Sequence, residues 1–176
     1  MALGRRVRLY YPGLTRDRYD RALAHVVTID GAGPALWLNL ELVARGAARV
    51  RLYPDTAARG GELLQAEADA RASRTGLWAL RAYAAYPADA VASDLRGFTL
   101  VQGQLGQVLA GGLDRRGEIT CRRTLAGSPL VVDVRGPAQA VCEAPAGTSY
   151  RLRGWVSDGR LDLVVSAHAE PAGEGP

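Results

Sequence analysis

The sequence predicts a mainly β protein of the α+β class, built from two domains of different composition. In the first 80 residues, stretches with strand periodicity alternate with two stretches of helical periodicity. From residue 98 onward, short runs of β-branched and apolar residues are separated by glycine-containing turns, which is typical of a small barrel. Hydrophobic residues make up 48% of the 176 residues, which is enough for a packed core.

The first two elements are predicted to be strands. Residues 5–11 alternate between an apolar face (Val7, Leu9, Tyr11) and a more polar one (Arg6, Arg8, Tyr10), as a half-buried strand does. A Pro-Gly turn follows at 12–13. A second strand is expected over 21–29, and residues 30–33 close it with another turn.

A helix, a strand and a second helix should follow. The helix is expected over 34–45, because a proline occupies its first turn and apolar residues recur at helical spacing up to Gly46. Residues 48–53 alternate as a strand. The second helix should follow Gly60-Gly61 and continue until Gly76.

The second half is predicted to be all-β, after a linker at residues 81–97 that is rich in alanine. Strands are expected at 98–105, 118–125, 130–134, 138–142, 150–156 and 161–165. The last two should form a hairpin through the turn dipeptide Asp158-Gly159. The domains are therefore placed at 1–80 and 98–170, with a disordered tail at 171–176.

Charge and composition favour some partners over others. All 22 basic residues are arginine, and residues 1–80 hold 12 arginines against 8 acids, whereas residues 81–176 hold 10 of each. A polyanionic partner should therefore bind the first half. No apolar run approaches the roughly 20 residues of a membrane span. Cys121 and Cys142 can be a disulfide between two strands or two buried thiols, so the compartment stays open.

The most informative stretch is the charged turn at residues 15–23. It places Arg18 and Arg21 around Tyr19, with Asp17 and Asp20 beside them. A guanidinium matches two phosphate oxygens, and a tyrosine can stack on a base or donate to a phosphate. The same residues also suit an ion-pair network that only braces a hairpin.

Four successive blocks resemble motifs of the staphylococcal nuclease (thermonuclease) family, in the family's order and spacing. They are the segments Asp17–Ala24, Leu38–Ala48, Glu67–Arg71 and Thr75–Trp78. The resemblance implies a partial OB-type barrel with two helices over residues 5–80, and calcium-dependent hydrolysis of DNA or RNA. The second half resembles an appended OB-like barrel.

The resemblance also implies roles for single residues. Arg21 matches a catalytic arginine that holds the scissile phosphate, and Tyr19 matches a tyrosine that contacts substrate phosphate. Arg18 is expected to contact substrate beside them. Glu67 matches a structural glutamate and by position would brace Arg49.

The departures from the family restrict these expectations. The sequence starts just before the family's fourth strand, so the first strands and helix, which supply calcium ligands, the general base and another arginine, have no counterpart. We therefore expect an N-terminally truncated product or a decayed relative. Asp20 stands where the family usually has glycine. No metal ligands are predicted, and tight calcium binding is not expected.

The sequence thus predicts a thermonuclease-like phosphodiesterase that is inactive as this chain, so its status as an enzyme is left open. The alternative is a non-catalytic module that binds DNA or RNA with weak to moderate affinity. The oligomeric state is not predicted.

Overall fold

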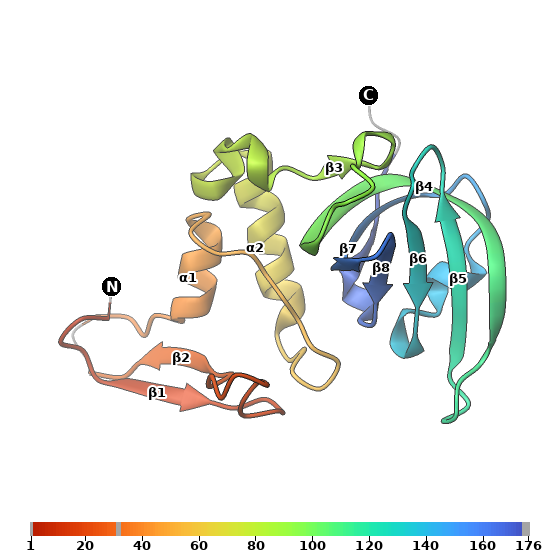
Figure 1. Cartoon of the computed structure of the whole chain (residues 1–176). Coiled ribbons are helices and arrows are strands. Elements are labelled where there is room, and N and C mark those ends of the chain that lie inside the picture. The colour runs from red at the N-terminus through yellow and green to blue at the C-terminus, as the bar shows by residue number, and fades with distance from the viewer. Residues whose placement is uncertain (1, 31–32, 174–176) are drawn as a thin grey trace. The chain divides into compact units, whose positions relative to one another are not determined.

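The computed structural model describes residues 2–30 and 33–173, and the chain divides into two compact units, residues 1–84 and 85–176 (Figure 1). Both units mix strands with short helices, and strands dominate the second, which confirms the predicted class. Among the described residues, no helix is long and apolar enough to cross a bilayer. The turn predicted at 30–33 includes residues 31 and 32, which lie outside the described residues.

The first unit begins with an antiparallel pair of strands, β1 (Val7–Tyr10) and β2 (His25–Thr28). The other edge of β2 is covered by the segment that follows it, since the N–H of Thr28 donates to the carbonyl of Leu36 at 3.0 Å and Val27 forms a bridge with Trp37. Because residues up to 37 pair with β2, the first helix begins later than predicted.

Two α-helices complete the first unit, α1 (Leu38–Ala44) and α2 (Gly60–Ala72), followed by the 3₁₀ turns η1 (Gly76–Ala79) and η2 (Arg81–Tyr83). The buried apolar side chains of this unit are Trp37, Val43, Val50, Leu52, Leu63, Ala70 and Trp78. Gly46 ends α1 with φ +61°, and a Cβ there would lie 2.1 Å from the carbonyl oxygen of Thr75. Only glycine allows this close approach.

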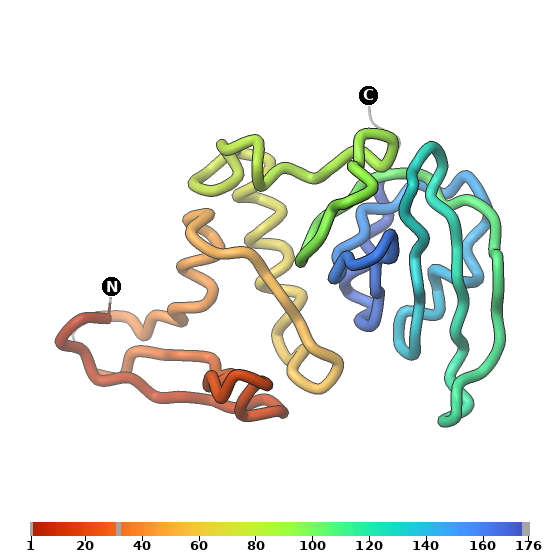
Figure 2. Tube along the Cα trace, in the orientation of Figure 1, coloured from red at the N-terminus to blue at the C-terminus, as the bar shows by residue number. Residues whose placement is uncertain are grey.

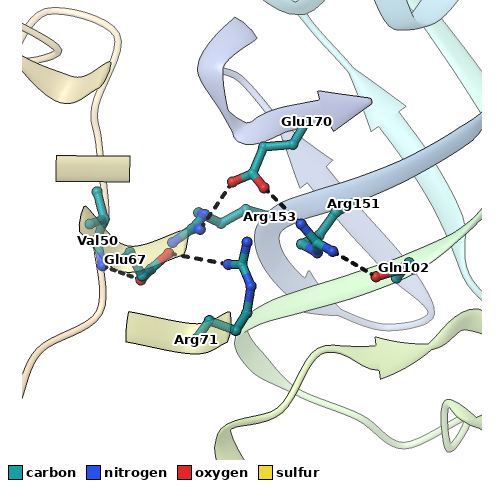
Figure 3. A network of polar contacts seen from close by, with 7 residues as sticks. All are labelled: Val50, Glu67, Arg71, Gln102, Arg151, Arg153 and Glu170. Carbon is teal, nitrogen blue, oxygen red and sulfur yellow. Dashed lines mark hydrogen bonds and ion pairs between the residues drawn. The ribbon is translucent and has the colours of Figure 1, made fainter. Parts of the chain in front are cut away.

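The strand predicted at 48–53 is absent. Val50 and Leu52 point into the core as the alternation predicts, but the segment joins no sheet. Instead, the N–H of Val50 donates to Oε1 of the buried Glu67 on α2 at 2.7 Å (Figure 3). A carboxylate thus serves as a backbone acceptor where a neighbouring strand would otherwise do so.

The second unit contains one sheet that closes on itself. Its strands are β3 (Tyr86–Pro87), β4 (Gly97–Leu113), β5 (Ile119–Leu125), β6 (Val131–Val134), β7 (Ser149–Ser157), β8 (Arg160–Leu163) and β9 (Ala169–Pro171). Pairing runs β4-β5-β6-β8-β7 and returns from β7 to β4, because β4 pairs with β7 over its first half and with β5 over its second. Figure 1 shows the curvature of β4 that this double pairing requires. Five strands paired in a ring are the arrangement of OB-type folds.

Two predicted segments in or next to this unit contain other elements than expected. Residues 81–97, predicted as a linker, include η2 at the end of the first unit, and β3 and the 3₁₀ turn η3 (Ala88–Ala90) in the second. Residues 138–142 form the end of a 3₁₀ turn, η4 (Gly136–Ala138), and the start of α3 (Ala140–Glu143) instead of a strand, because a proline at the first turn favours helical geometry.

The predicted tail is ordered at its start. Pro171 pairs with Tyr150 as part of β9, after the 3₁₀ turn η5 (Ser166–His168). The carboxylate of Glu170 accepts from Arg151 at 3.1 Å, and Arg151 also donates to Gln102 on β4 at 3.0 Å (Figure 3). Residues 174–176 lie outside the described residues.

A disulfide joins Cys121 on β5 to Cys142 on α3, across a sequence separation of 21. The second of these cysteines lies on a helix and not on a strand. Of the alternatives that the sequence leaves open, the structure therefore has the bonded pair. Cys121 is part of the buried apolar core inside the ring of strands.

Candidate phosphate-binding site

The charged turn is a tight loop between β1 and β2 of the first unit. Figure 2 shows the chain folding back between the two strands. The loop closes through backbone hydrogen bonds from Leu23 to Thr15 at 2.9 Å and from Asp17 to Arg21 at 3.0 Å, with a bridge between Arg16 and Ala22. These bonds fix the backbone on both sides of Tyr19 and Arg21.

Asp17 organises the loop from its centre. Its Oδ1 accepts the backbone N–H groups of Tyr19 at 2.9 Å and Arg21 at 3.0 Å, and its Oδ2 accepts from the Arg21 Nε at 2.6 Å. The hydrogen bond to Arg21 is the main cause that lowers the pKa of Asp17 to about 2, and the two backbone N–H groups add to it. Asp17 therefore stays ionised and holds the Arg21 side chain in one orientation.

Arg21 is held by Asp17 and yet remains accessible. Its side chain is 66% exposed, whereas that of Asp17 is only 5% exposed. Asp17 engages Nε and Nη2, and the exposed remainder of the guanidinium can still donate to another acceptor. The pKa of Arg21 is raised, first by this hydrogen bond and then by the charge of Asp17. A positioned and permanently charged guanidinium of this kind suits an anionic oxygen ligand.

The structure brings the three residues predicted from the sequence together. The Cζ atoms of Arg18 and Arg21 lie 4.7 Å and 5.3 Å from the centroid of the Tyr19 ring. The Tyr19 ring itself is exposed. One aromatic face flanked by two cations can accommodate a phosphate beside a base or sugar.

Tyr53 is a residue outside the loop that influences Arg21, and the sequence alone did not indicate it. It contributes to the raised pKa of Arg21, so it lies within electrostatic reach of that guanidinium. The Cζ of Arg51 lies 5.0 Å from the Tyr53 ring centroid. A second aromatic–arginine pair two residues apart, as in Arg51-Leu52-Tyr53, is the signal that could have indicated it.

The acidic residues of this loop do not fit a calcium ion. Calcium takes about six to eight oxygen ligands. Both Asp17 oxygens are already used inside the loop, and the exposed Asp20 pairs with Arg16 at 3.0 Å. In the part of the chain that the structure describes, no group of three or more His, Cys, Asp or Glu side chains could hold a metal ion.

A comparison with protein families found a match that spans most of the first unit. Residues 4–80 match the family model of the staphylococcal nuclease homologues. This match confirms the resemblance for the first unit, which we call the nuclease-like domain. No curated protein is similar to the chain.

The structure also shows the surroundings of two residues that the family resemblance singled out, Asp20 and Glu67. Asp20 has φ +61°, which is the left-handed region that the glycine usual in the family adopts freely. Glu67, which the resemblance places beside Arg49, is fully buried. Its carboxylate accepts the N–H of Val50, the residue that follows Arg49 in the sequence. Arg71 on the same helix lies 3.8 Å from Glu67 (Figure 3).

Proposed function

We propose that the nuclease-like domain binds the phosphodiester backbone of DNA or RNA at the loop that contains Arg18, Tyr19 and Arg21. The observation that carries the proposal is the Arg21 guanidinium, which Asp17 orients through two N–H groups while the side chain stays 66% exposed. The match of residues 4–80 to the nuclease homologues supports nucleic acid as the anion. The excess of arginine over acids in this half of the chain supports it as well.

We further propose that this chain binds nucleic acid without hydrolysing it to any great extent. The family's reaction depends on calcium, and the loop carboxylates are committed to Arg16, Arg21 and the loop backbone. Arg21 would then hold the phosphate of the bound nucleic acid. Stabilising the charge of a transition state would also require a metal ion and a general base, which the loop does not supply. An active calcium-dependent nuclease is the competing function.

The test is fluorescence anisotropy with a labelled single-stranded oligonucleotide over a salt series, using the full chain. We expect Arg21→Ala to weaken binding about tenfold, as loss of one charged hydrogen bond does, and to reduce the slope of log K against log salt by about one. Arg45→Ala is a matched control, because Arg45 is 63% exposed and also pairs with an acid four residues away. Equal loss in both variants would contradict a site at Arg21.

Hydrolysis is measured separately, by incubating the same oligonucleotide with calcium or with a chelator. Little cleavage is expected under either condition. Rapid calcium-dependent turnover that Arg21→Ala abolishes would favour the competing function and refute binding without hydrolysis.

A further inference from the structure

Strand β1 has an apolar face that the described residues leave substantially exposed. The alternation of residues 5–11 predicts a half-buried strand, but all four residues of β1 are exposed. Val7 and Leu9 are 39% and 45% exposed, and Tyr11, which continues the same face, is exposed too. A two-stranded sheet is marginally stable in water by itself. The apolar alternation of β1 is therefore typical of a strand that pairs with another strand besides β2.

The backbone of β1 offers a free edge for that partner. Val7 and Leu9 stand opposite Thr28 and Val26 in the β1–β2 register. Thr28 and Val26 donate their N–H groups away from β1, to the Leu36 carbonyl at 3.0 Å and to the Asn39 Oδ1 at 2.9 Å. Opposed residues of an antiparallel pair share one state, either bonded to each other or both directed outward.

It follows that Val7 and Leu9 direct their N–H and C=O groups away from β2, and Tyr11 continues this alternation. Within the described residues, none of these groups has a hydrogen-bond partner on that side. An unpaired edge of this kind is a template for another strand.

We propose that this edge pairs antiparallel with the same edge of a second copy of the chain, around a two-fold axis at Leu9. The proposal is independent of the proposed function. The two hairpins would form one four-stranded sheet with a self-complementary interface. On the apolar face, Leu9 meets Leu9 of the second copy and Val7 meets Tyr11, so the uncovered side chains cover one another.

The charges of β1 select this register. When Leu9 lies on the axis, all three outward-directed residues pair, and Arg8 stands opposite Tyr10 of the second copy, where a cation–π contact is possible. Sliding the strands so that Val7 opposes Leu9 would place Arg8 opposite Arg8. Like charges directly opposite each other destabilise a sheet, so that register is disfavoured.

The first test is the mass of the full chain in solution, measured by light scattering and sedimentation at increasing protein concentration. We expect a dimer, and we expect Leu9→Lys to shift it to monomer because two like charges would then meet on the axis. Leu14→Lys is the matched control: Leu14 is 46% exposed but lies outside the strand, so the variant should remain dimeric. Thermal unfolding checks that both variants fold. A monomeric wild type, or a dimer that survives Leu9→Lys, would overturn the proposal.

The second test reads the register by disulfide trapping. The native cysteines are already bonded to each other, so an introduced cysteine is the single thiol among the described residues. Leu9→Cys should cross-link with itself, because the two Cα atoms would lie roughly 5.5 Å apart in a hydrogen-bonded pair. Val7→Cys alone should not, at roughly 14 Å, but it should cross-link when mixed with Tyr11→Cys. Self-cross-linking of Val7→Cys, or none at Leu9→Cys, would refute this register.

Discussion

Replacing Arg123 with methionine should destabilise the second unit strongly, although the two side chains are of similar length. Arg123 lies on β5 and is 2% exposed. Its guanidinium donates to the carbonyls of Val141 at 2.8 Å, Ala144 at 2.5 Å and Gly106 at 2.6 Å. It therefore joins the end of α3 to the middle of β4.

The expected loss is about 3 kcal/mol. Methionine leaves three carbonyls without this donor, one of them buried and two partly buried. A buried unsatisfied group costs about 1–3 kcal/mol, and a partly buried one costs less because water can reach it. Part of this cost is offset, because the unit no longer has to bury a charge; that burial is the main cause of the lowered pKa of Arg123. For a domain of this size, 3 kcal/mol lowers the midpoint of thermal unfolding by roughly 12–24 °C.

The assay is thermal unfolding followed by circular dichroism, with the transition of the second unit assigned by amide hydrogen exchange of β5. The adjacent Arg122→Met variant is the control, since Arg122 is 39% exposed and its ion pair with Asp133 is only partly buried. A surface ion pair contributes about 0–1 kcal/mol. If the two variants unfold at the same temperature, the hydrogen bonds of Arg123 do not stabilise the unit and the reasoning fails.

Two further predictions concern the first unit. Because the folded-state pKa of Asp17, about 2, is below its usual value, the stability that this carboxylate contributes is complete above pH ~4 and is lost as the pH falls toward 2. Asp17→Asn should remove that part of the pH dependence of urea unfolding between pH 5 and 2, and an unchanged profile would contradict it. Gly46→Ala should destabilise by about 1–3 kcal/mol in urea unfolding, because its Cβ would lie 2.1 Å from the Thr75 carbonyl oxygen. Gly61→Ala, with open space around it on a helix, should instead stabilise by about 0.5–1 kcal/mol.

The parts of the fold that sequence predicted well are those with local causes. The hairpin of β7 and β8 turns through Asp158 and Gly159, whose φ values of +48° and +72° are those that an Asp-Gly hairpin turn requires. Both helices of the first unit lie in the segments predicted for them, with ends shifted by up to four residues. By contrast, the backbone acceptor of Val50 is a glutamate 17 residues later, and no strand pattern carries that information.

The candidate site divides in the same way. Arg18, Tyr19 and Arg21 lie within one turn, so their proximity was predictable from the sequence alone. The influence of Tyr53 on Arg21 depends on the tertiary fold, because Tyr53 lies far from the loop in the sequence. The burial of the Arg123 charge was not predictable either. Arg123 occupies an inward-facing position of β5, and the alternation of the strand does not show that backbone carbonyls will accept hydrogen bonds from its guanidinium.

The long strand β4 belongs to two pairings at once, with β7 through residues 97–104 and with β5 from Leu105 onward. Detaching it would remove neighbours on both sides of the second unit together. Local unfolding of β4 therefore costs nearly as much free energy as unfolding of the whole second unit. The slowest-exchanging amides of β4 should report the free energy of complete unfolding.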